Sequence, residues 1–164
     1  MKIIGISGKK GAGKDTIADI LLCHYPKSIK YSFAAQLKIE VSHATGYGVE
    51  YIELHKENFR LILQGWGTDF RRKLFGEDYW IKKMEDAKER LSINHDVLIV
   101  PDVRFTNEYD WVKRNDGIVI RVERNHDYGD VHASEVELDN ATFDHTILNI
   151  GSFMDLQQKV MEIV

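Results

Sequence analysis

The chain has 164 residues, of which 43% are hydrophobic and 29% charged, and its formal net charge is −4. This length predicts a single domain with its own core, and the mildly acidic balance argues against a protein that binds duplex nucleic acid. No apolar stretch approaches the roughly 20 residues of a membrane span, and the N-terminus lacks a signal-peptide pattern. The lone cysteine, Cys23, excludes an intramolecular disulfide. We therefore expect a cytoplasmic protein, with Cys23 buried on the first helix.

The first elements enclose a glycine-rich loop. An apolar run at 2–7 predicts a buried parallel strand, and the apolar periodicity of 14–24 predicts a helix. Between them, residues 8–16 read Gly-Lys-Lys-Gly-Ala-Gly-Lys-Asp-Thr, which matches the G-x-x-x-x-G-K part of phosphate-binding loops. Asp15 stands where that motif has Ser or Thr. The loop amides, the helix N-terminus and Lys14 favour phosphate binding over an ordinary glycine turn.

Strands and helices alternate along the rest of the chain. Strands are predicted at 29–32, 96–100, 118–123 and 146–150, and helices at 33–45, 57–75, 79–91, 107–115 and after Ser152, with one turn at 50–55. This alternation predicts an α/β fold, with a five-stranded parallel sheet flanked by helices. The predicted single domain has core segments 1–32, 96–123 and 146–164, a helical insertion at about 33–92 and a lid loop at about 124–140.

Polar residues follow several of these strands, at the sheet edge where ligands of such folds bind. Asp102 ends an apolar strand and is predicted to hold Mg²⁺, with a turn-forming role as the alternative. Arg104 either clamps phosphate oxygens or pairs with a nearby acid, and the two readings carry equal weight. Arg121 and Arg124 end the next strand. We expect both on one face, with Arg124 as the phosphate ligand.

The insertion carries side chains suited to a second ligand. Arg60 and Gln64 are four residues apart and share a helical face, so that an amide could read a base and an arginine could hold a monophosphate. At least one of Arg71 and Arg72 is expected to be simply solvated. The aromatic side chains of this region are expected to be core residues rather than stacking platforms: Trp66, Phe70, Tyr79 and Trp80. His126 and His132 have no third ligand at zinc spacing.

Together these segments resemble the deoxynucleoside monophosphate kinases of bacteriophages, within the P-loop nucleoside monophosphate kinases. The resemblance rests on residues 8–16, 32–38, 63–71, 78–80, 102–108 and 132–135, which follow the family's order. It implies the three-layer P-loop kinase fold, ATP as phosphoryl donor, Mg²⁺ and a deoxynucleoside monophosphate as acceptor. It also implies a homodimer, and the host cytoplasm as location if the protein is encoded by a phage.

The residues and the resemblance together assign the parts of the site. We expect Lys14, Arg104 and Arg124 to act in catalysis, Gly11, Ala12, Gly13, Lys14, Asp15 and Thr16 to bind ATP, and Asp15 and Asp102 to hold the metal. The acceptor site implied by the resemblance comprises Lys10, Ser32, Phe33, Ala34, Lys38, Arg60, Gln64, Arg71, Trp80, Arg104, Glu108, Ser134 and Glu135.

Two other functions stay open. One is a kinase for another small phosphorylated metabolite, such as phosphomevalonate, because those enzymes can share the Gly-Lys-Asp variant of the loop. The other is an ATP-gated binding module without transfer chemistry. The several arginines favour an enzyme with a second phosphorylated ligand, and Gln64 favours a base over an aliphatic acceptor.

Overall fold

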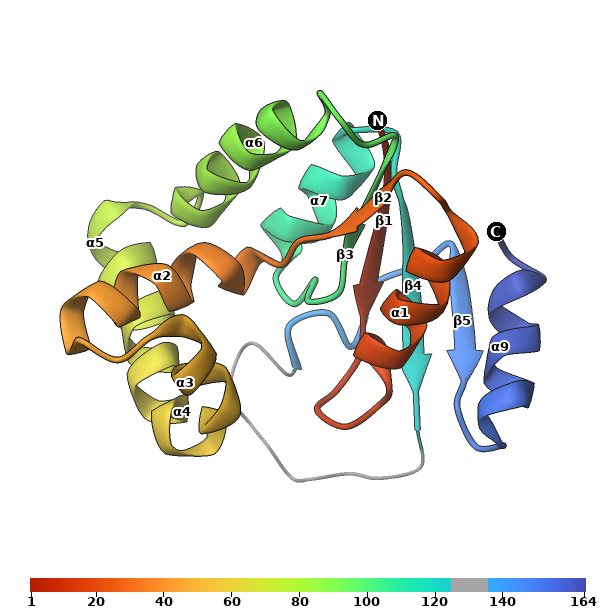
Figure 1. Cartoon of the computed structure of the whole chain (residues 1–164), viewed down its shortest axis with the longest axis horizontal. Helices are drawn as coiled ribbons and strands as arrows, with labels where there is room; N and C mark the ends of the chain where they lie inside the picture. Colours follow the sequence, from red (N-terminus) through yellow and green to blue (C-terminus); the bar gives the residue numbers. More distant parts are fainter. Residues whose placement is uncertain (125–135) are drawn as a thin grey trace. The chain divides into compact units, whose positions relative to one another are not determined.

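The computed structural model describes residues 1–124 and 136–164, which form two compact units. The first unit comprises Met1–Tyr31 and Lys88–Val164, and the second comprises Ser32–Ala87. Figure 1 shows the helices and strands of both units, coloured along the chain.

The first unit is built on a five-stranded sheet in which every neighbouring pair is parallel. Its strands are β1 (Lys2–Ser7), β2 (Ser28–Lys30), β3 (Val97–Val100), β4 (Ile118–Glu123) and β5 (His145–Leu148), in the order β2-β3-β1-β4-β5. Its complete helices are α1 (Lys14–His24), α7 (Thr106–Arg114) and α9 (Phe153–Met161). The predicted parallel α/β fold is therefore confirmed.

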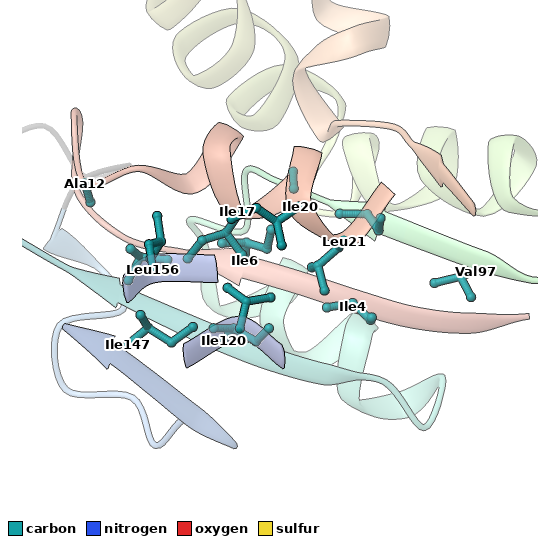
Figure 2. Close-up of a cluster of buried hydrophobic side chains, with 14 residues drawn as sticks. Ile4, Ile6, Ala12, Ile17, Ile20, Leu21, Val97, Ile120, Ile147 and Leu156 are labelled. Carbon is teal, nitrogen blue, oxygen red and sulfur yellow. The ribbon is translucent and has the colours of Figure 1, made fainter. Parts of the chain in front are cut away.

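Helices cover both faces of this sheet, with α1 and α9 on one face and α7 on the other (Figure 1). Figure 2 shows the core beneath α1 and α9, where Ile4, Ile6 and Ile120 of the strands meet Ile17 of α1 and Leu156 of α9. On the other face the packing leaves little room for a side chain at Gly5 of β1. A Cβ on Gly5 would lie 3.0 Å from Val103 and 3.2 Å from Val112.

The parallel arrangement brings the segments after the strands to one edge of the sheet. β1 leads into the glycine loop, β3 into Pro101 and Asp102, and β5 into Asn149. Because parallel strands share one direction, these carboxyl ends lie at the same edge. This edge is where ligands bind in folds of this kind.

The first helix differs from expectation at one position. Cys23 is exposed, so its predicted burial is wrong. The buried apolar stripe of α1 runs through Ile17, Ile20 and Leu21. Cys23 follows Leu21 by two residues, about 200° around the helix, and so points away from the sheet.

The second unit is helical. It contains α2 (Phe33–Thr45), α3 (Val49–Leu54), α4 (Lys56–Gln64), the π-helix η1 (Gly65–Arg72), α5 (Lys73–Phe75) and most of α6 (Tyr79–Leu91), whose last residues belong to the first unit. Its core centres on Val41, Ile52 and Phe59. The helix predicted over 57–75 is present as α4, η1 and α5, and its middle part is the wider π-helix η1. A Cβ on Gly67 would lie 3.2 Å from the end of the Leu37 side chain, so Leu37 packs closely against η1 at this position.

Candidate active site

The glycine loop has the backbone geometry of an anion cradle. Gly8, Gly11 and Gly13 have φ angles of 151°, 72° and 106°, which side-chain-bearing residues rarely adopt. A Cβ on Gly8 would lie 2.5 Å from the Val122 carbonyl oxygen, and one on Gly13 would overlap the side-chain nitrogen of Asn149. Gly8 is therefore required by conformation and by space and Gly13 by conformation, and the loop fits a phosphate group.

Lys14 is enclosed by this loop. It is the first residue of α1, it is only 9% exposed, and its Nζ donates hydrogen bonds to the carbonyl oxygens of Gly8 (2.6 Å) and Lys9 (2.8 Å). The ammonium group thus lies among the backbone groups of the loop and beside the positive end of the α1 dipole. Asp15 is exposed in the first turn of α1, and Thr16 is half-buried.

Asn149 braces the loop, although no motif pointed to it. Its Nδ2 donates to the Ala12 carbonyl oxygen (2.8 Å), and its backbone N–H donates to the Glu123 carbonyl oxygen (2.7 Å). A polar residue directly after an apolar strand, at the edge that carries the loop, was the signal that could have identified it.

Arg121 differs from expectation. It is buried, whereas Arg124 is exposed, so the two do not share a face. Residues three apart in a strand point to opposite faces because side chains alternate. The Arg121 guanidinium donates to Ser7 Oγ (3.3 Å) and to Asp139 Oδ1 (2.7 Å), and Lys9 Nζ lies 3.8 Å from Asp139 Oδ2. An arginine in an otherwise apolar buried strand was a readable signal of this network.

Asp102 and Arg104 follow β3 and are both half-buried. Glu108 is 3% exposed, and its Oε2 accepts hydrogen bonds from the backbone N–H groups of Arg104 (2.8 Å) and Phe105 (3.2 Å). Glu108 therefore caps the N-terminus of α7 and fixes the backbone that carries Arg104. Tight backbone capping is a role for Glu108 that the sequence did not indicate.

The possible metal ligands can be tested against these surroundings. Within residues 1–124 and 136–164, no group of three or more His, Cys, Asp or Glu side chains is arranged to hold a metal ion. Mg²⁺ is commonly held by one or two carboxylates together with phosphate oxygens of a ligand. Asp15 lies in the first turn after the glycine loop, and Asp102 follows β3, the neighbour of the strand that leads into that loop, so their two carboxylates fit that donor set. The same part of the chain has no helix with the length and apolar character needed to cross a membrane.

Four predicted residues of the acceptor site lie in or beside α2. Phe33 is buried, and Ser32 and Ala34 are half-buried at the start of the helix. Lys38 forms an ion pair with Glu53 of α3. Burial alone would raise the pKa of the Glu53 carboxyl group, but hydrogen bonds and charge from Lys38 and Lys56 outweigh it, and the pKa lies below 4.5. Lys38 is thereby held against α3.

Three further predicted residues lie on or beside α4 and η1. Arg60 is half-buried, with its Nη1 4.0 Å from Glu57 Oε2, and Gln64 is half-buried at the end of α4. Trp80 is only 4% exposed, and its Nε1 donates to the Gly67 carbonyl oxygen (3.0 Å). Any effect of Trp80 on a ligand therefore acts through the packing of η1.

The remaining predicted acceptor residues lie elsewhere in the chain. Lys10, on the glycine loop, is half-buried. Ser134 and Glu135, and the histidines His126 and His132, lie outside the described residues.

Arg71 and Glu40 lie at the centre of a polar cluster in the second unit. Glu40, on α2, accepts hydrogen bonds from Arg71 Nε (2.6 Å), Trp66 Nε1 (3.0 Å) and Tyr79 OH (2.6 Å). Burial alone would raise the pKa of Glu40, but these three donors outweigh it and lower the pKa below 4.5. Burial and the Glu40 charge raise the pKa of Tyr79 above 10.0. Neighbouring Arg72 is 4% exposed and donates to the Glu77 carbonyl oxygen, so it is packed rather than solvated.

The glycine loop with its enclosed lysine, placed after the central strand of an all-parallel sheet, defines the first unit as a P-loop domain of the kinase type. Two solved structures share the fold. A protein from Thermus thermophilus, TT1252, has a TM-score of 0.58 at 18% identity, covering 99% of this chain and 95% of that one. Shikimate kinase from Aquifex aeolicus has a TM-score of 0.50 at 12% identity, covering 98% and 94%.

Comparison of sequences narrows this class to a family. A family model described as "Deoxynucleotide monophosphate kinase" matches residues 49–160, and the chain belongs to this family. The chain is 24% identical to the deoxynucleotide monophosphate kinase of Enterobacteria phage T4, covering 98% of this chain and 97% of that protein. It is 29% identical to a protein of Acanthamoeba polyphaga mimivirus whose name proposes the same kinase activity, and the match covers 100% of this chain and 96% of that protein. It is also 28% identical to phosphomevalonate kinase from Drosophila melanogaster, over 71% of this chain and 62% of that protein.

Proposed function

We propose that this protein transfers the γ-phosphoryl group of ATP to the phosphate of a deoxynucleoside monophosphate, giving ADP and a deoxynucleoside diphosphate for DNA synthesis. The observation that carries the proposal is the cradle of Gly8, Gly11 and Gly13 around the enclosed Lys14, in a chain of this kinase family. A backbone cradle with an ammonium group suits the terminal phosphates of a nucleotide.

On the donor side, the loop residues Gly11 to Thr16 bind the phosphates of ATP. Lys14 neutralises charge on the transferring group, and its two hydrogen bonds to loop carbonyls keep the ammonium inside the cradle. Asp15 and Asp102 hold Mg²⁺, which when bound neutralises charge on phosphate oxygens. Arg104 and Arg124 supply further positive charge to the transferring phosphoryl group.

On the acceptor side, the phosphate of the monophosphate is bound by arginines and the base is read by an amide. Arg71 and Arg60 of the second unit supply guanidinium groups, and Gln64 can offer both a donor and an acceptor to a base edge. The remaining proposed acceptor residues support this ligand: Lys10, Ser32, Phe33, Ala34, Lys38, Trp80, Glu108, Ser134 and Glu135.

The chemistry needs no general base. The attacking atom is a phosphate oxygen, which is already anionic at neutral pH, so the protein's task is to align two polyanions and neutralise their charge. The residues proposed above supply cations and backbone amides for that purpose. The lid predicted at about 124–140, which would exclude water and so limit hydrolysis of ATP, lies mostly outside the described residues.

We also propose that the protein is a homodimer, as the resemblance implied. Large exposed apolar side chains on the second unit support this, since Leu54, Leu61 and Leu74 are 80%, 83% and 67% exposed. A cytoplasmic location, and the absence of duplex nucleic acid or membrane among its partners, stay predictions from the sequence.

A second candidate acceptor is phosphomevalonate, which the similarity to the Drosophila enzyme favours. Both acceptors carry a phosphate that arginines can bind, but only the deoxynucleoside monophosphate carries a base. An aliphatic acceptor gives Gln64 no base edge to read. The ATP-gated binding module is disfavoured by membership of a kinase family.

An acceptor survey tests the proposal. ADP release from ATP would be followed with each deoxynucleoside monophosphate, each ribonucleoside monophosphate and phosphomevalonate in turn. We expect one or more deoxynucleoside monophosphates to give the highest kcat/KM. Phosphomevalonate as the best acceptor would refute the proposal, and ADP release independent of any acceptor would leave only an ATPase.

A further inference from the structure

Glu40 and Arg71 form an ion pair in which the carboxylate makes more hydrogen bonds than the guanidinium. The Glu40 carboxylate is 13% exposed and accepts three hydrogen bonds, from side chains on η1 and α6. The Arg71 guanidinium has five N–H donors, of which Glu40 takes only the one on Nε. Among the described residues, none other than Glu40 accepts a hydrogen bond from Arg71. The pair is therefore closed at the carboxylate and open at the two Nη groups.

Four aromatic rings lie close to the guanidinium group of Arg71. Arg71 Cζ lies 5.0 to 5.5 Å from the ring centroids of Trp66, Phe70, Phe75 and Tyr79. A cation near ring faces is attracted by their quadrupoles, and the rings limit its rotation. The Arg71 side chain nevertheless remains 20% exposed. A guanidinium bonded at Nε and crowded by four rings has little freedom to rotate, and its two Nη groups stay available as a fork.

The π-helix makes this arrangement possible. Trp66 and Arg71 both donate to Oε2 of Glu40 although they are five residues apart. In an α-helix five residues rotate by about 500°, which places them on nearly opposite sides. The i→i+5 repeat of a π-helix brings such residues into line, and π-helical turns often occur at functional sites. The wide turn of η1 thus lets both side chains reach one oxygen.

We propose that Glu40 is a positioning residue: it holds Arg71 by Nε so that Nη1 and Nη2 form a preset fork for two oxygens of the acceptor's phosphate. This inference rests on the proposed function, because it assumes that the acceptor is a monophosphate bound by Arg71. A planar guanidinium matches two phosphate oxygens through two parallel hydrogen bonds. Holding the fork in place reduces the entropy lost when the phosphate binds.

A double-mutant cycle tests the proposal. Glu40→Gln keeps the shape of the side chain, removes its charge and turns an amide toward donors. We expect it to raise the Kd of the best deoxynucleoside monophosphate about tenfold, to leave the KM for ATP unchanged, and to leave binding of the corresponding deoxynucleoside unchanged. Arg71→Ala should have an effect of about 10- to 100-fold on the same Kd. In the double variant, the Glu40 change should add almost nothing, because Glu40 acts through Arg71.

Matched variants separate positioning from general damage. Glu50→Gln removes an equivalent charge from an exposed position at the start of α3 and should leave the acceptor Kd unchanged. Tyr79→Phe removes one donor to Glu40 while keeping the ring and the charge. If Glu40→Gln does not fold, Tyr79→Phe must still raise the acceptor Kd at constant KM for ATP, or the proposal is wrong.

The outcomes distinguish this inference from the proposed function. A wild-type protein that phosphorylates deoxynucleoside monophosphates, with an unchanged acceptor Kd in Glu40→Gln, overturns the positioning role alone. Additive effects in the double variant overturn it as well, because they place Glu40 and Arg71 in separate roles. An equal loss of deoxynucleoside binding would assign the cluster to the base and contradict the phosphate fork. A wild-type protein inactive on every deoxynucleoside monophosphate overturns both.

Discussion

Asp15 is the residue at which the phosphate loop departs from the usual motif, in which a hydroxyl ligates magnesium. Its carboxylate is exposed in the first turn of α1. Beside the phosphates of ATP, such a charge is repelled unless a cation lies between them. We therefore expect Asp15→Asn to raise the Mg²⁺ concentration for half-maximal rate by up to about fivefold, since the attraction between two exposed opposite charges contributes about 0.2–1 kcal/mol.

A Mg²⁺ titration of the rate at saturating substrates measures this effect. Asp19→Asn is the matched control, because it removes the same charge from an exposed position of α1 that pairs with Lys30. Nucleotide binding without metal should be unchanged or tighter in Asp15→Asn. Superimposable titration curves for the wild type and Asp15→Asn would leave Asp15 as a residue that only complements the helix dipole.

The role of a residue was predictable from the sequence where the residue belongs to a local motif. It was not predictable where the role depends on a partner that is distant in the sequence. The phosphate loop was readable because its glycines and Lys14 act within nine residues of sequence. Asn149 and Ala12 meet only because β5 and the loop after β1 share a sheet edge, and Glu40 meets Arg71 across 31 residues. Such partners depend on tertiary packing, which spacing alone does not encode.

Gly13 joins two elements, since it ends the loop and is the N-cap of α1 with φ 106°. Alanine there would have to adopt a left-handed conformation, at about 1–2 kcal/mol, and its Cβ would displace Asn149. We expect Gly13→Ala to raise the Kd of ATP about tenfold or more. Isothermal titration calorimetry measures this directly.

Gly48→Ala serves as the control for that substitution. Gly48 has no positive φ, and a Cβ there would meet nothing within 4 Å, so its replacement should leave ATP binding unchanged. ATP binding by Gly13→Ala as tight as that of the wild type would show that the loop does not need its left-handed turn.

Most helices were placed by apolar periodicity, but the π-helix was not. The pattern over 57–75 predicted one helix with a disturbance at Gly65 and Gly67. The structure has α4, η1 and α5 in continuous succession. The wide turn depends on the residues that pack against it, since Leu37 lies against Gly67 and Glu40 accepts a hydrogen bond from Trp66. The apolar periodicity of one helix gives no information about contacts made by a second helix.

At the scale of the whole molecule, the alternation of strands and helices was enough to predict a parallel sheet with helices on both faces. The strand order β2-β3-β1-β4-β5 was not predictable in the same way, because near-continuous apolar runs indicate burial but not neighbours. The two units of the fold also differ in how the chain builds them. The first brings together distant segments, whereas the second is one continuous stretch, Ser32–Ala87.

If the protein transfers a phosphoryl group between two nucleotides, the γ-phosphate of ATP must end up on the acceptor, and following that phosphate tests the transfer most directly. ATP labelled in that phosphate would be incubated with the protein, Mg²⁺ and the deoxynucleoside monophosphates. We predict that the label appears in deoxynucleoside diphosphate, that Lys14→Ala loses most of this transfer, and that Lys27→Ala, an exposed lysine paired with Asp96, retains it. Label found only in inorganic phosphate, or retained in ATP, would contradict the account.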